Sequence, residues 1–325
     1  MMKKEWVDIL RLLLALMVVC EHALLPTDSY LFNLFVRGFS VPVFFYLSGL
    51  LYYRNFNTLS DYRIKIVHRL RTLLLPYLLW NVMILVPLLV VNCVKNGLYV
   101  QQLTSFLSGF LFYDGLLSGH NLAGNYFPAN VPLWYLRDLM VIVCACPLLS
   151  ILMKRVHVVL PLASLLLWLL FFSNWYGCFF MGVFFFYLGS IDVERFVRLV
   201  PQYGFILLFL LFAGCSWAGI DYYFPVPFAC LFFLLLSAKV AMLLSDQGVG
   251  SKIAAFSGFS AFLYCSHYLL VRRLFYFFFM SLPVGISTVF AGLADAVLVT
   301  VLLWIVYVCL SRRYPRLVKL LIGKS

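Results

Sequence analysis

Charged residues are scarce in this sequence. Only 11% of its 325 residues are Asp, Glu, Lys or Arg, whereas a soluble globular domain carries about a quarter. Hydrophobic residues make up 65% of the chain, which leaves too little polar surface to cover a particle in water. This composition excludes an ordinary soluble protein and predicts an integral membrane protein.

Long polar segments are also missing. A membrane-spanning helix needs about 20 apolar residues, so ten of them would use roughly 200 and leave only short loops. Apolar runs between helix breakers predict helices over 6–25, 39–53, 73–93, 132–152, 159–173, 177–190, 203–219, 224–244, 255–271 and 286–310. The sequence therefore predicts an all-α helix bundle of about ten transmembrane helices. It forms a single domain over 1–325, with no appended soluble domain.

Signals for cleavage, metal binding and disulfides are absent as well. No small-x-small cleavage site follows the first apolar run, so residues 6–25 are predicted to be a retained helix. The nine cysteines lie almost entirely in apolar runs, without a CxxC pair or a Cys/His ligand spacing. This pattern favours buried thiols, with no metal site and no bound cofactor.

Positive charge is in excess, with a net charge of +12. In a membrane protein such an excess reports orientation rather than nucleic-acid binding. With the N-terminus inside, 17 of the 24 lysines and arginines fall in predicted cytoplasmic segments and four in outer segments. This distribution predicts that both termini are cytoplasmic. The segment 103–117 is ambiguous between a re-entrant and an interfacial piece.

Ionisable groups gather on the first predicted helix, although each is costly inside a bilayer. Arg11 and His22 are eleven residues apart, so a helix turns by about 1100° between them and both project from one face, about 16.5 Å apart along the axis. Asp8 precedes Arg11 by three residues, where it can pair with the guanidinium. A single intramembrane His is more often a packing residue, and an Arg near a helix end often snorkels. The combination favours a functional face, and Glu21 beside His22 has no role that the pattern assigns.

Residues 6–23 resemble the first helix of the acyltransferase 3 family of bacterial membrane acyltransferases, whose signature is an Arg, ten residues and a His. Further motifs similar to those of the family follow in order: the aromatic run ending in Ser48 and Gly49, the basic segment with Arg69, Arg71 and Pro76, the helix start with Trp134, Tyr135, Arg137 and Asp138, and the late group of Ser260, Tyr264 and His267.

This resemblance implies the transfer of an acyl group, usually acetyl, from acyl-CoA to a hydroxyl or amine of an envelope glycan, glycolipid or related acceptor at the bacterial inner membrane. His22 would act as the catalytic base or carry the acyl group itself. Arg11 would hold the donor or anchor helix packing through Asp8. A rival interpretation is a transporter-like protein that moves a small solute or acyl group without catalysis.

A basic inner loop before the third helix is the predicted binding site for the coenzyme A phosphates, through Arg63, Lys65, Arg69 and Arg71. The alternative is a topology determinant attracted to anionic lipid. Candidates for the acceptor site or cavity are Ser48, Trp134, Arg137, Asp138, Tyr264 and His267. For Arg137 and Asp138 a structural pair competes with acceptor binding, and for Trp134 an interfacial aromatic belt is the commoner explanation.

Overall fold

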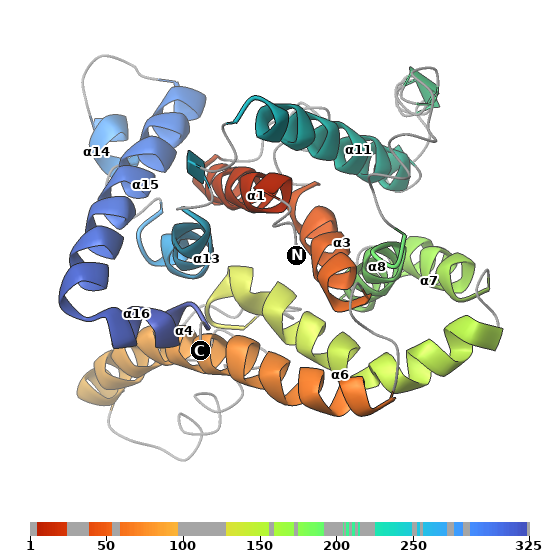
Figure 1. The fold of residues 1–325 in the computed structure, drawn as a ribbon. Coiled ribbons are helices and arrows are strands. Elements are labelled where there is room, and N and C mark those ends of the chain that lie inside the picture. The colour runs from red at the N-terminus through yellow and green to blue at the C-terminus, as the bar shows by residue number, and fades with distance from the viewer. Residues whose placement is uncertain are drawn as a thin grey trace. The chain divides into compact units, whose positions relative to one another are not determined.

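Every regular element in the part of the chain that the structure describes is a helix (Figure 1). The structure is a computed structural model. It describes residues 5–24, 39–53, 59–96, 128–155, 159–171, 175–191, 225–248, 256–271, 276–281 and 287–323, and short helical pieces at 204, 206–207, 210–211, 214 and 252–253. The predicted segments 103–117 and most of 203–219 lie outside the described residues.

The chain divides into two compact units. The first spans 1–62 and 145–260 and contains α1 (Glu5–Ala23), α3 (Ser40–Tyr53), α7 (Val159–Leu170), α8 (Trp175–Leu188) and α11 (Pro225–Asp246). The second spans 63–144 and 261–325 and contains most of α4 (Leu59–Asn96), η1 (Val131–Leu133), η2 (His267–Leu269), α14 (Tyr276–Ser281), α15 (Thr288–Arg313) and α16 (Pro315–Leu321). The boundary between the units passes through α4, α6 (Trp134–Arg155) and α13 (Ser257–Ser266).

Close backbone contact joins α3 to α8 in the first unit. A Cβ atom added at Gly49 would lie 1.9 Å from the carbonyl oxygen of Phe186, and one added at Gly189 would lie 2.4 Å from a backbone nitrogen of α3. The hydroxyl of Tyr46 donates to the carbonyl of Ile191 at 2.8 Å. Small residues let two helices approach this closely, so the Ser48 and Gly49 motif has a packing explanation at its glycine.

The two ends of the α1 to α3 connection are also anchored within the first unit. The ring of Phe39 stacks on that of Phe233 in α11, with centroids 3.8 Å apart. The hydroxyl of Ser40, the first residue of α3, donates to the carboxylate of Glu21 near the end of α1 at 3.3 Å. These contacts fix where α1 ends relative to α3 and α11.

Helix α15 has one exposed apolar face and one buried face. Its exposed apolar side chains recur at helical spacing and include Phe290, Leu293, Val297, Val301 and Ile305. Its buried face carries Gly292, Asp295, Ala296, Val299 and Leu303. An apolar stripe of this length would be a liability in water. On this helix it is a surface suited to lipid.

Three described helices are long and apolar enough to span a membrane: Ile66–Lys95, Val226–Asp246 and Thr288–Arg313. The apolar helices Ser40–Tyr53, Val159–Leu170 and Gly177–Leu188 are shorter, since a span needs about 17–25 residues. The described part of the structure thus confirms an all-helical architecture, with three helices that are candidates for membrane spans. The count of ten spans and the cytoplasmic termini stay predictions.

The prediction of a basic loop before the third helix is wrong. These residues are helical, because α4 already begins at Leu59. Residues 59–75 contain neither Gly nor Pro and are rich in good helix formers. Pro76 lacks the N–H that would bond the carbonyl of Thr72. Gly323 (φ 67°) approaches this carbonyl, since a Cβ there would lie 1.9 Å from its oxygen. A contact from the far end of the chain thus covers the carbonyl that the proline leaves free.

The remaining helix ends differ by a few residues from the prediction, except late in the chain. The expected helix over 255–271 is α13 followed by the 3-10 turn η2. Helices α14 and α16 were not predicted, since each has only six or seven residues and leaves too short a periodic pattern to read.

Candidate functional site

Helix α1 carries the first group of candidates, and it is continuous over both Arg11 and His22. The Nη1 atom of Arg11 lies 3.5 Å from Oδ1 of Asp8, and the side chains are 37% and 16% exposed. The pair is therefore partly open to solvent. A guanidinium has five N–H donors, so Arg11 can hold Asp8 and still offer donors to an anionic ligand.

His22 lies near the end of α1 and is half-buried, while Ala15 and Val18, between it and Arg11 on the same stripe, are buried. The continuous helix places Arg11 and His22 about 16.5 Å apart along the axis. They therefore cannot act on one atom. Glu21, next to His22, accepts the hydrogen bond from Ser40, which gives this carboxylate a local partner in α3.

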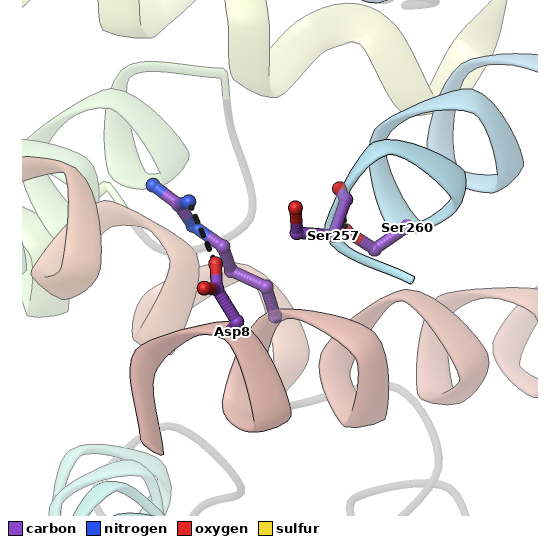
Figure 2. Close-up of polar contacts among 4 residues, drawn as sticks. Asp8, Ser257 and Ser260 are labelled. Atoms are coloured by element: carbon purple, nitrogen blue, oxygen red, sulfur yellow. Dashed lines mark hydrogen bonds and ion pairs between the residues drawn. The ribbon is translucent and has the colours of Figure 1, made fainter. Parts of the chain in front are cut away.

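The start of α13 lies near the other end of this face. Figure 2 shows Asp8 on α1 together with Ser257 and Ser260, which belong to the first turn of α13. The hydroxyl of Ser260 donates to the carbonyl of Ser257 at 2.8 Å. Ser257 and Ser260 thus belong to the first unit, as Asp8 does, whereas Tyr264 and His267 of the same late motif belong to the second.

The second group of candidates lies at the start of α6. Nε of Arg137 donates to Oδ1 of Asp138 at 2.8 Å, and the side chains are 5% and 0% exposed. Adjacent residues do not face each other on a helix, so the short bond requires both side chains to turn toward one another. Trp134, the first residue of α6, is half-buried.

Tyr264 and His267 are held by backbone groups of the second unit. The hydroxyl of Tyr264 donates to the carbonyl of Pro132 in η1. Nδ1 of His267 lies 2.9 Å from the carbonyl oxygen of Tyr264 and 3.0 Å from that of Leu263. Both oxygens are acceptors, so these contacts assign the proton to Nδ1 and leave Nε2 as the acceptor in the neutral ring. His267 is fully buried, unlike His22.

Two buried asparagines link separate segments of the second unit by hydrogen bonds. They were not predicted from the sequence. The side chain of Asn81 in α4 donates to the carbonyl of Tyr77 and accepts from the backbone N–H of Asn130. The amide of Asn130 donates to the carbonyl of Cys265. Asn81 lies inside an apolar run of α4, and a polar residue there signals an intramembrane partner. That signal could have found it.

Asp295 was also missed. It is fully buried on the inward face of α15, a helix whose other buried residues are apolar. A carboxylate within a candidate span is costly and marks a position with a specific role. Its isolation in the apolar stretch 286–310 was the available signal.

Arg69 and Arg71, the two donor-site candidates on α4 whose side chains the structure describes, lie on different sides of the helix. Arg69 is half-buried and Arg71 is exposed. Two residues on a helix point about 200° apart, so the two guanidinium groups leave α4 on different sides. The backbones of Arg63 and Lys65 belong to α4, but their side chains lie outside the described residues. Ser48 is half-buried in α3.

No group of three or more His, Cys, Asp or Glu residues that could hold a metal ion occurs among the described residues. The eight described cysteines are free thiols.

The family follows from a match that covers nearly the whole chain. The sequence model for the acyltransferase 3 family, described as an acyltransferase domain, matches residues 4–310. The chain belongs to the acyltransferase 3 family. The match includes α1 at one end and nearly all of α15 at the other, so both units belong to the family domain.

The chain is similar in sequence to the succinoglycan biosynthesis protein ExoH of Rhizobium meliloti (strain 1021). The two are 26% identical over 246 residues, which cover 71% of this chain and 65% of the relative. This chain thus spans less than two thirds of the relative's length. No solved structure matches the chain.

Proposed function

We propose that this family member is a membrane enzyme that transfers an acetyl group from acetyl-CoA to a hydroxyl of a cell-envelope carbohydrate at the bacterial inner membrane. The family match supports acyl transfer. The relative's role in succinoglycan biosynthesis supports a glycan as acceptor. The described spans and the lipid-facing stripe of α15 support a membrane setting.

The observation that carries the proposal is the polar face of α1, with a half-open ion pair at one end and a half-buried imidazole at the other. His22 is the proposed base. Its neutral imidazole takes the proton from the acceptor hydroxyl as that oxygen attacks the thioester carbonyl. The carbon–sulfur bond then breaks, and the imidazolium returns the proton to the departing thiolate. The products are an ester and free coenzyme A.

Arg11 is proposed to bind an anionic part of the donor rather than the reacting carbonyl. The axial separation of about 16.5 Å from His22 excludes contact with the same atom. Asp8 holds the guanidinium through Nη1, which limits its rotamers, and the exposed remainder keeps its donors for a phosphate oxygen. Asp8 is in this scheme a positioning residue.

Arg69 is the proposed contact for donor phosphates on α4. It is half-buried, and arginine suits phosphate because its planar fork presents paired donors. Arg71 leaves α4 on a different side and lines a separate groove. In a loop, Arg69 and Arg71 could bind the same phosphate. On the helix their side chains point in different directions, so we do not propose that they share one.

The test uses the full chain purified in detergent, with radiolabelled acetyl-CoA and envelope glycan fractions. We expect the wild type to label glycan and His22→Ala to lose at least a hundredfold in rate, as is typical when general base catalysis is removed. Cys20→Ala is the matched control, because Cys20 is a half-buried free thiol at the same end of α1. Normal rates in His22→Ala would contradict the assignment.

The same assay separates the remaining alternatives. Label retained on the wild-type protein in denaturant, and lost in His22→Ala, indicates a two-step route through acyl-His. A wild type that neither labels glycan nor hydrolyses the thioester, but moves label across a proteoliposome membrane, supports the transporter. Donor affinity measured with Arg69→Ala tests the contact on α4 independently of His22.

A further inference from the structure

A groove lies between α4 and α16 in the second unit. It has a volume of about 440 Å3, which is within the size range of ligand sites, about 300–1000 Å3. Its wall is almost wholly apolar and includes Leu74, Leu78 and Leu320. Arg71 and Lys319 also line it, and none of its described lining residues is acidic.

The groove is built by two specific contacts. The indole Nε1 of Trp80 donates to the carbonyl of Leu321 at 3.0 Å, in a buried bond. Gly323 lies so close to the carbonyl of Thr72 that any side chain there would clash. These contacts seat the end of α16 on α4. The groove is therefore a defined feature of the second unit.

Its occupant must combine an apolar part with a negative charge. Leu74, Leu78 and Leu320 are each more than a third exposed, so they offer an apolar surface that protein leaves uncovered. Arg71 and Lys319 are exposed as well. Two cations beside an apolar trough, with no acidic side chain among the lining residues that the structure describes, complement a phosphate joined to a hydrocarbon chain.

The location fits a lipid of the inner leaflet. Helix α16 has exposed leucines beside exposed cations, as in helices that lie in the membrane interface. It follows the span Thr288–Arg313 directly, in the basic C-terminal segment that the charge distribution predicts to be cytoplasmic. Basic pockets between helices on that side bind anionic lipid head groups.

We propose that the groove between α4 and α16 binds one anionic glycerophospholipid, with its phosphate between Arg71 and Lys319 and an acyl chain along Leu74, Leu78 and Leu320. The site is distinct from the proposed transfer chemistry. The lipid would fasten α16 to α4 from the membrane side, in addition to the bond from Trp80.

The test titrates delipidated full-length protein with phosphatidylglycerol and counts bound lipid by native mass spectrometry. Phosphatidylethanolamine, glycerol 3-phosphate and acetyl-CoA are titrated in parallel. We expect preference for phosphatidylglycerol over the other three, and an affinity about fivefold lower in Lys319→Ala, the usual effect of one basic residue at an anionic surface. Leu320→Ala is expected to weaken lipid binding as well.

Arg316→Ala is the matched control, because Arg316 is exposed on the same helix and is not part of the groove lining. Equal losses in Arg316→Ala and Lys319→Ala would reduce the effect to general surface charge and overturn the proposal. Equal affinity for phosphatidylethanolamine would overturn it too. Displacement of the lipid by acetyl-CoA would assign the groove to the donor instead. None of these outcomes depends on transfer activity at His22.

Discussion

Replacing Gly49 by alanine tests the close contact between α3 and α8. The new Cβ would lie 1.9 Å from the carbonyl oxygen of Phe186, whereas real Cβ atoms essentially never approach closer than 3.0 Å. One backbone must therefore move by at least the difference, about 1.1 Å. Because the obstructing atom is a backbone oxygen, it cannot turn aside as the end of a flexible side chain would.

The expected cost follows from two opposing terms. Alanine in place of glycine favours a helix by about 1 kcal/mol, and overpacking a well-packed site costs about 1–3 kcal/mol, sometimes more. The backbone clash puts Gly49→Ala at the upper end, so we expect a net loss of about 2 kcal/mol. For a chain of 325 residues, that loss corresponds to an apparent Tm lower by roughly 3 °C.

The assay is thermal unfolding in detergent, followed by intrinsic tryptophan fluorescence. Gly214→Ala is the matched control, since a Cβ at that position meets no atom within 4 Å from the described residues beyond its own helix turn, and we expect it to be neutral or slightly stabilising. Gly189→Ala should destabilise like Gly49→Ala, and the double variant should cost less than the sum because both change one interface. Equal Tm values for Gly49→Ala and Gly214→Ala would refute the reasoning.

Two further variants probe the second unit. Arg137→Ala leaves the carboxylate of Asp138 buried without its 2.8 Å partner, so we expect a loss of about 3–5 kcal/mol in thermal unfolding, and wild-type stability would show that the pair is dispensable. Trp80→Phe removes the donor to the carbonyl of Leu321, at a cost of about 1–3 kcal/mol. We expect faster tryptic cleavage after Lys319 in that variant, and an unchanged rate would mean that α16 is held by other contacts.

Local patterns in the sequence predict much of this fold. The apolar runs place α1, α3, α7, α8 and α11 within three residues of their observed ends. The spacing of Asp8 and Arg11 predicts a contact that the helix permits, and the structure holds the two 3.5 Å apart. In each case the information lies within one helix, where periodicity and capping signals act.

Contacts between distant segments decide what the sequence could not predict. Pro76 after a basic stretch resembles the end of a loop, yet α4 runs through it, and the Thr72 carbonyl that it leaves free meets Gly323. The closeness of Arg69 and Arg71 in the sequence predicts that they bind phosphate together, but on a helix their side chains point about 200° apart. The bonds of Asn81 and Asn130 join segments 49 residues apart, and no local pattern encodes that pairing.

The burial of each ion pair indicates whether substituting its residues would affect stability or activity first. The pair of Arg137 and Asp138 is almost fully buried, so removing either residue breaks a buried ion pair and disturbs folding first. The pair of Asp8 and Arg11 is 16% and 37% exposed, and such pairs add only about 0–1 kcal/mol to stability. A loss of transfer activity on changing Arg11 therefore bears on the chemistry, whereas the same loss at Arg137 bears on the fold. We therefore expect substitutions on the partly exposed face of α1 to test the proposed chemistry with little effect on stability.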